Sequence, residues 1–354
     1  MAHPNKCWLL LLLASVQLSC TWGVVQRVDY RLPRAVTVPV GSSATDSIRP
    51  FAETFCATLA HLDPSGTTWG SCEKYIEAQV APQPAATGVI PGQLKVMVVG
   101  GAFSECFEAR NVNPFEQGLQ HLQTHGIVTG PAVRIGGTAT PEVNAGRIDA
   151  YLRQPENAGD YIAVGHSKGA VDLMTAIEKY ESARTRIKAL VSVAGAISGS
   201  RLADLGPRAT IIGFQTAARK SGLGNCQITD EGGIDSLRRH ARYKALQGWR
   251  PPASLRTYSV VGVTSRTETS SVLHTMWDLN AYYSIDQDSQ MIAEEAIIPG
   301  AAFLGIAKGD HWALALPFSE HPVKRIRDGV DRNSFPRTAL LEAIVRYVHA
   351  TLPQ

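Results

Sequence analysis

The pentapeptide GHSKG, residues 165–169, contains the residue types that most directly suggest chemistry. A serine hydroxyl is a poor nucleophile at neutral pH unless a base takes its proton and the resulting oxyanion is stabilised. The run YIAV before the pentapeptide is apolar, and the apolar residues after it recur at helical spacing. A G-x-S-x-G pattern at such a strand-to-helix corner predicts Ser167 as a nucleophile, whereas the pattern alone also fits a structural turn.

The oxyanion formed by such a nucleophile needs hydrogen-bond donors. Gly165 and Gly169 flank the serine because side chains at a sharp elbow would collide with neighbouring backbone. A helix that starts at Lys168 directs its free amides toward the serine, so the Lys168 amide is the first expected donor. The second donor is expected in the glycine-rich segment VVGGAF, from the amide of Ala102 or Phe103; the segment also fits a plain strand end.

The base is expected to be a histidine in a loop after a late strand. His311 fits, because the segment LGIAKGDHWALA places it after an apolar run and a short turn. His166 is adjacent to the serine, and neighbouring side chains at a tight elbow diverge, so we expect it to pack nearby. His274 and His321 follow no strand and are interpreted as surface or packing residues.

The third member of a serine hydrolase site is a carboxylate that orients the imidazole. It should follow the strand that precedes the strand of His311, where the segment SIDQDSQM offers Asp288, our preferred candidate, and Asp286. Asp278 is a more distant alternative, and Asp310 is interpreted as a turn residue because it directly precedes His311. The resulting order of serine, aspartate and histidine is that of α/β-hydrolases, and it differs from the trypsin-like and subtilisin-like orders.

Apolar runs and helical segments alternate from about residue 94, which predicts a parallel sheet covered by helices. The expected strands lie in the segments LKVMVVGGAF, DYIAVGHS, IKALVSVAGA, SLRTYSVVGVTS and GAAFLGIAKGDH. Residues from about 200 to 252 interrupt this alternation and are interpreted as a small cap insertion with a helical piece at SLRRHARYKAL; an ordinary crossover with long loops would read similarly. The predicted organisation is therefore a hydrolase domain over 91–354, preceded by an extension over 21–90.

The first 20 residues have the layout of a secretory signal peptide, with Lys6 before an apolar stretch and then small or polar residues. A second interpretation makes Cys20 the lipidated cysteine of a lipoprotein, which would attach the chain to a membrane or lipid surface. The formal net charge of +3 is small for 354 residues, and the basic residues are scattered except near residues 323–332. No nucleic-acid partner is expected.

Four further cysteines, Cys56, Cys72, Cys106 and Cys226, suggest two disulfides in an exported chain, although buried free thiols are the alternative. Of the three pairings, we prefer a bridge between Cys56 and Cys72 because it closes a short loop. No cysteine spacing suggests zinc.

Two histidines, His121 and His125, stand four residues apart, which is a metal-ligand spacing. They have no adjacent glutamate and no third ligand, so no metal site is predicted.

The chain resembles the α/β-hydrolase superfamily, and within it exported bacterial lipases and esterases. The resemblance rests on the segments GHSKGAVDL, SVAGAISGS, DSQMIAEEAIIPGA and AKGDHWALALP and covers roughly residues 94–317. It implies a mainly parallel sheet with helices on both faces and a triad of Ser167, Asp288 and His311 at the carboxyl ends of the strands.

The implied activity is hydrolysis of a small-molecule or lipid ester without a cofactor. A thioester or polyester substrate, acyl transfer to an alcohol, and a non-catalytic binding protein of the same fold are the alternatives. The oligomeric state is not predicted.

Overall fold

The computed structural model describes residues 45–352, apart from residues 79, 81–93, 131–132, 225 and 227. The chain divides into two units, Met1–Ala35 and Val36–Gln354, and every described residue belongs to the second. The predicted signal peptide and Cys20 lie outside the described residues.

The described strands form one sheet in the order β1-β6-β5-β4-β3-β2, and every neighbouring pair is parallel. Strands covered on both faces read as nearly continuous apolar runs, and β3 and β4 do so because almost every residue in them is buried. The predicted α/β fold with a parallel sheet is confirmed. The strands are β1 (Thr45–Asp46), β2 (Lys95–Val99), β3 (Tyr161–His166), β4 (Ile187–Val193), β5 (Arg256–Val263) and β6 (Ala302–Lys308).

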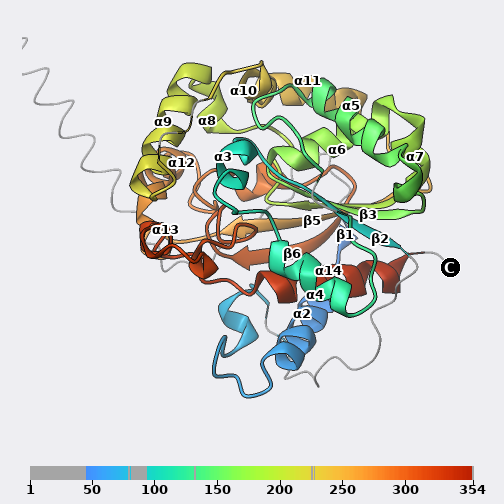
Figure 1. The fold of residues 1–354 in the computed structure, drawn as a ribbon, viewed down its shortest axis with the longest axis horizontal. Coiled ribbons are helices and arrows are strands. Elements are labelled where there is room, and N and C mark those ends of the chain that lie inside the picture. The colour runs from blue at the N-terminus through green and yellow to red at the C-terminus, as the bar shows by residue number, and fades with distance from the viewer. Residues whose placement is uncertain are drawn as a thin grey trace, which may run out of the picture. The chain divides into compact units, whose positions relative to one another are not determined.

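Helices cover both faces of the sheet (Figure 1). One face carries α2 (Ile48–Leu62), α4 (Glu116–Thr124) and α14 (Arg337–Thr351), and the other carries α5 (Pro141–Leu152), α6 (Lys168–Lys179) and α7 (Glu181–Arg186). Further short helices include α3 (Ser104–Glu108), α12 (His274–Ala281) and α13 (Lys324–Gly329). Within the described part of the chain, no helix has the length and apolar character needed to cross a membrane.

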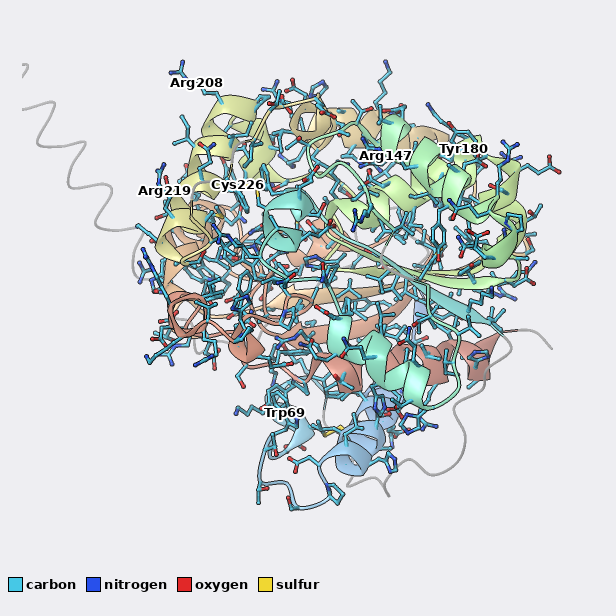
Figure 2. All side chains as sticks on the ribbon, viewed as in Figure 1. Trp69, Arg147, Tyr180, Arg208, Arg219 and Cys226 are labelled. Atoms are coloured by element: carbon cyan, nitrogen blue, oxygen red, sulfur yellow. A yellow bond between two sulfur atoms is a disulfide. The ribbon has the colours of Figure 1, made fainter. Side chains whose placement is uncertain are left out.

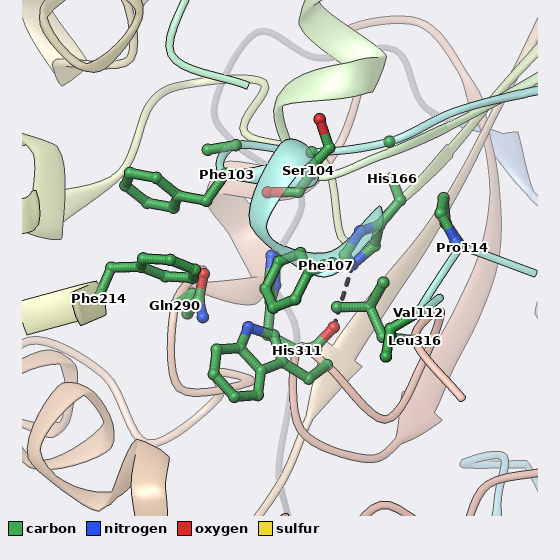
Figure 3. A pocket seen from close by; sticks show the side chains of 15 residues that line it. Phe103, Ser104, Phe107, Val112, Pro114, His166, Phe214, Gln290, His311 and Leu316 are labelled. Carbon is green, nitrogen blue, oxygen red and sulfur yellow. Dashed lines mark hydrogen bonds between the residues drawn. The ribbon is translucent and has the colours of Figure 1, made fainter. Parts of the chain in front are cut away.

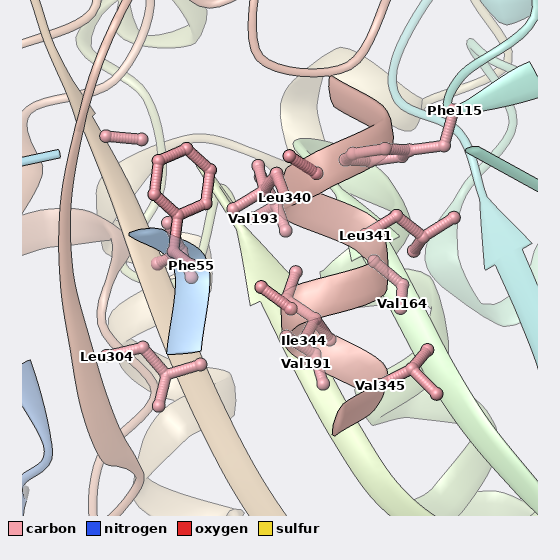
Figure 4. Close-up of a cluster of buried hydrophobic side chains, with 14 of the residues drawn as sticks. Phe55, Phe115, Val164, Val191, Val193, Leu304, Leu340, Leu341, Ile344 and Val345 are labelled. Atoms are coloured by element: carbon pink, nitrogen blue, oxygen red, sulfur yellow. The ribbon is translucent and has the colours of Figure 1, made fainter. Parts of the chain in front are cut away.

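The C-terminal helix α14 anchors one of these faces. Figure 4 shows Leu340 and Ile344 on α14 meeting Val191 and Val193 of β4, with Phe55 of α2 beside them. All of these side chains are at most 1% exposed. Because burying one such side chain contributes about 1.5–3 kcal/mol, this cluster fixes the early helix α2 and the last helix against the same strands.

Four helices are described between β4 and β5, in the segment interpreted as a cap insertion. They are α8 (Arg201–Asp204), α9 (Pro207–Lys220), α10 (Gly233–Ser236) and α11 (Arg239–Gly248). The sequence predicted a helical piece only at residues 236–246, which corresponds to the end of α10 and most of α11. The long helix α9 was not expected.

Two disulfides are present among the described residues, and the preferred bridge between Cys56 and Cys72 is confirmed. It joins α2 to a short 3₁₀ helix at Cys72–Lys74, with the two Cα atoms 5.2 Å apart. The second bridge joins Cys106 of α3 to Cys226, which follows α9, with Cα atoms 5.8 Å apart. Disulfides persist in oxidising compartments, so both bridges agree with an extracytoplasmic setting.

Candidate active site

Ser167 occupies a sharp turn between the end of β3 and the start of α6. Its backbone angles are φ 56° and ψ −126°, a conformation that costs a non-glycine residue free energy and is found at functional sites. A Cβ on Gly165 would lie 2.5 Å from the Ala170 amide nitrogen, and one on Gly169 would meet the Val99 carbonyl oxygen. The steric reason for both glycines is therefore confirmed, and the turn has the geometry of a nucleophile elbow.

His311 and Asp288 form a buried pair at the carboxyl end of the sheet. His311 follows β6 by three residues, and its Nδ1 lies 2.8 Å from Oδ2 of Asp288. The His311 amide also donates to the Asp288 carbonyl at 2.7 Å. The other carboxylate oxygen, Oδ1, accepts the amides of Gln290 and Met291 at 3.0 and 2.7 Å. Because Nδ1 donates to the carboxylate, Nε2 of the neutral ring is left as an acceptor.

Ser167 and His311 line the same cavity, shown in Figure 3. Residues 100–104, the loop after β2, line it as well. Gly101 packs directly on the serine, since a Cβ there would lie 2.7 Å from the Ser167 Cβ and 3.2 Å from its Oγ. The structure thus brings together the loop containing Ala102 and Phe103, the serine and the histidine that the sequence singled out.

The other acidic candidates lie in different surroundings. Asp310 is fully buried; its Oδ1 accepts the Trp312 and Ala313 amides, and its Oδ2 accepts the Ser270 amide, so it is the turn residue that was expected. Burial raises the pKa of Asp310, and these hydrogen bonds oppose that rise. Asp278 pairs with Arg266 at 2.6 Å on the surface. Asp286 precedes Asp288 by two residues, and its amide donates to the Ser284 hydroxyl.

The remaining histidines have other hydrogen-bond partners. Nε2 of His274 lies 3.1 Å from the Thr269 carbonyl, and Nε2 of His321 lies 2.8 Å from the Arg110 carbonyl. His121 pairs with the buried Glu342 at 2.6 Å, and its ring packs on His125. Over the described ranges, no group of three histidine, cysteine, aspartate or glutamate side chains is arranged to hold a metal ion.

The Lys168 side chain has a buried partner, Asp172, that its sequence context did not predict. Its ammonium is fully buried and lies 2.8 and 2.9 Å from the two carboxylate oxygens of Asp172, one helical turn later. Asn144 of α5 donates to Asp172 and also bonds both the amide and the carbonyl of Gly136. The i, i+4 spacing of lysine and aspartate was a readable signal, but their burial was not.

Breaking this buried pair should destabilise the fold. We expect Asp172→Asn to lower the free energy of unfolding by about 3–5 kcal/mol, because it leaves the Lys168 charge buried without a counter-charge. Asp328→Asn is the matched control, since it breaks an exposed i, i+4 pair with Lys324 and should cost less than about 1 kcal/mol. Urea titration measures both, and equal losses would contradict the importance of the buried pair.

His166 lines the same cavity, but its Nε2 is engaged with the backbone of His311 and is not free to act as a second base. Its Nε2 donates to the His311 carbonyl at 3.0 Å, and the two ring centroids are 4.7 Å apart (Figure 3). Burial, together with the neighbouring His311, lowers the pKa of His166 well below its usual value. The ring is therefore neutral in the folded protein near pH 7 and holds the loop of His311 in place.

This buried histidine predicts a pH-dependent stability. Below about pH 6.5 the unfolded chain protonates this residue while the folded protein does not, so its contribution is complete above that pH and is lost as the pH falls. As the pH falls below about 6.5, wild type should lose stability more steeply than His166→Asn, the difference in slope rising toward about 1.4 kcal/mol per pH unit. Chemical unfolding at each pH measures the difference. The exposed His125→Asn should keep the wild-type slope, and an unchanged slope in His166→Asn would refute the prediction.

Comparisons with known proteins show which folds and sequences this chain is similar to. A carboxyl esterase from a metagenome is 31% identical and has a TM-score of 0.77, over 94% of this chain and 99% of that chain. Lipase 1 from Pelosinus fermentans shares the fold at 10% identity and a TM-score of 0.55, over 75% of this chain and all of the other. EstA from Clostridium botulinum shares the fold at 10% identity and a TM-score of 0.51, over 74% of this chain and 89% of that chain. No family model matches the sequence, and a search of curated proteins gives no significant match.

The parallel sheet, the elbow and the similarity to the metagenomic enzyme define the class of protein. The chain belongs to the α/β-hydrolase family, in the group of bacterial esterase- and lipase-like members.

Proposed function

We propose that this protein hydrolyses carboxylic esters through Ser167, His311 and Asp288. The observation that carries the proposal is the strained serine at the elbow, lining one cavity with a histidine whose Nδ1 is held 2.8 Å from a buried carboxylate. The similarity to a carboxyl esterase over nearly the whole chain supports the same reaction.

The mechanism follows from the roles of these three side chains. His311 Nε2 takes the Ser167 proton as the hydroxyl oxygen attacks the ester carbonyl carbon, and Asp288 stabilises the imidazolium that forms. The tetrahedral intermediate collapses when His311 returns the proton to the departing alkoxide, leaving an acyl-serine and a free alcohol. Water then attacks the acyl carbon by the same steps and releases the acid.

The oxyanion of the tetrahedral intermediate needs two donors near Ser167. The Lys168 amide stands at the first position of α6, where amides have no partner within the helix. For the second donor we favour the Ala102 amide over that of Phe103. The Ala102 amide directly follows Gly101, which packs on Ser167. The Phe103 amide nitrogen is instead packed against Gly137.

The proposal also covers the export of the enzyme and its domain organisation. An N-terminal signal peptide over residues 1–20 would export the chain, and the two disulfides agree with an oxidising compartment. Lipid attachment at Cys20 is the alternative, which would hold a lipid ester substrate and the enzyme at one surface. We take residues 91–354 as the catalytic domain and the helices within 201–248 as its cap.

A substrate panel tests the proposed reaction. We expect the purified protein to hydrolyse p-nitrophenyl esters, with a burst of nitrophenol equal to the enzyme concentration if deacylation is slower than acylation. A thioester, a polyester film and a triglyceride emulsion measured beside them define the substrate class. Hydrolysis of the thioester alone would contradict the proposed ester specificity, and absence of any turnover would contradict the proposed function.

A further inference from the structure

The cavity beside Ser167 is bounded by packed aromatic rings. Phe103 and Phe214 are stacked, with ring centroids 4.0 Å apart and planes 16° from parallel (Figure 3). Phe107 meets Phe214 edge-on at 5.5 Å, and Trp312 lies 6.3 Å from Phe214. Phe214 and Trp312 are each 2% exposed, so these rings form a rigid wall.

Little space remains inside this wall. The volume open to the centres of water-sized atoms is about 30 Å³, which is room for about two water molecules. The Ser167 elbow and the loop that contains Gly101 line the same cavity, and the ester carbonyl must sit beside the Ser167 hydroxyl. An apolar group attached to that carbonyl therefore meets the aromatic rings after only a few carbon atoms.

Phe214 comes from a different part of the chain than the rest of the cavity. It belongs to α9. Among the described residues that line the cavity, no other comes from the helices between β4 and β5. Arg208 and Arg219 point outward from the exposed side of α9 in Figure 2. Phe214 of the same helix is buried and lines the cavity. The position of α9 therefore decides how far the cavity extends.

A covalent bond fixes this segment to the cavity wall. Cys226, labelled in Figure 2, is bonded to Cys106 of α3, the helix that begins after Phe103 and includes Phe107. The Gln215 side chain, next to Phe214, donates to the Cys226 carbonyl at 3.1 Å. The disulfide thus links the two segments whose phenylalanine rings stack.

We propose that Phe214, clamped by the disulfide between Cys106 and Cys226, restricts the acyl group of the substrate to short chains of about two to four carbons. The restriction rests on the proposed ester hydrolysis. Phe214 is then a residue that determines substrate specificity. The disulfide between Cys106 and Cys226 keeps Phe214 in place.

Substitution of the ring tests the restriction. The ratio of kcat/KM for p-nitrophenyl octanoate to that for the acetate should rise at least about tenfold in Phe214→Ala, and less in Phe214→Leu. Phe318→Ala is the matched control: Phe318 is fully buried and packs on Phe107 and Trp312, but it does not line the cavity. It should lose stability and keep the wild-type ratio. An unchanged ratio in both Phe214 variants, or an equal rise in Phe318→Ala, would overturn the proposal.

Removal of the disulfide tests the clamp. The double variant Cys106→Ser/Cys226→Ser should also raise the octanoate-to-acetate ratio, by about three- to tenfold, because α9 is freed from α3. The double variant Cys56→Ser/Cys72→Ser removes the other bridge, which lies at α2, and should leave the ratio unchanged. A wild-type ratio in the first variant would refute the clamp.

A binding measurement separates this inference from the proposed function. Octanoate and acetate are titrated into Ser167→Ala by calorimetry, with and without Phe214→Ala, so no turnover is required. We expect Phe214→Ala to tighten octanoate binding at least about tenfold and acetate binding little. If wild type hydrolysed no ester while octanoate binding still tightened, the proposed function would fail and the size limit would stand. Equal octanoate affinity in Ser167→Ala with and without Phe214→Ala would overturn the size limit itself.

Discussion

Ser167→Ala should lower kcat for p-nitrophenyl acetate by about four to six orders of magnitude, because the attacking oxygen is removed and the members of a triad act as a unit. The alanine has no hydroxyl for His311 to deprotonate, and the remaining rate comes from binding and oxyanion stabilisation alone. A stopped assay with high enzyme concentration measures the residual rate.

The control for this variant is Ser236→Ala, which removes a serine hydroxyl on α10 that bonds a backbone carbonyl. It should retain activity within about twofold. Circular dichroism confirms that both variants are folded. A Ser167→Ala protein with more than about a tenth of the wild-type kcat would show that another residue is the nucleophile.

Asp288→Asn should lower kcat by about three to four orders of magnitude while the protein stays folded. The amide oxygen of the substituted side chain can still accept the backbone amides of Gln290 and Met291, which leaves its NH₂ group facing His311 Nδ1. The ring then adopts the tautomer with the proton on Nε2, which cannot accept a proton from the serine. The loss should therefore appear in kcat, with little change in the free energy of unfolding.

The matched control is Asp286→Asn, the alternative acid considered from the sequence. Its side chain is two residues away, and Asp288 supplies the oxygen bonded to His311, so the loss in kcat should be less than about tenfold. Kinetics on both variants decide between the two acids. A large loss in Asp286→Asn with activity retained in Asp288→Asn would assign the role to the other residue.

Much of the sheet and the positions of the candidate residues could be predicted from the sequence. The apolar run before Ser167 forms β3, and the run before His311 forms β6. In a parallel sheet the carboxyl ends of the strands share one edge, so residues following different strands are brought together there. The same rule explains how Asp288, in the loop after β5, reaches His311.

The structure around these residues was less predictable. The helix α9 was missed because its start, Gly206-Pro207, and its internal Gly213 are typical of loops, and only a few of its side chains are buried. The stacking of Phe214 on Phe103 joins residues more than a hundred positions apart, which no local pattern encodes. Lys168 shows the same limit, since no local pattern indicates that this charged side chain is fully buried in a pair with Asp172.

The most direct measurement of the central claim is covalent labelling with a fluorophosphonate, followed by mass spectrometry of the proteolysed protein. The phosphonate should attach to the Ser167 oxygen, at one label per chain, and labelling should fall at least about a thousandfold in His311→Ala because the base is lost. A label on any other residue, or labelling of Ser167 at the wild-type rate without His311, would contradict the account.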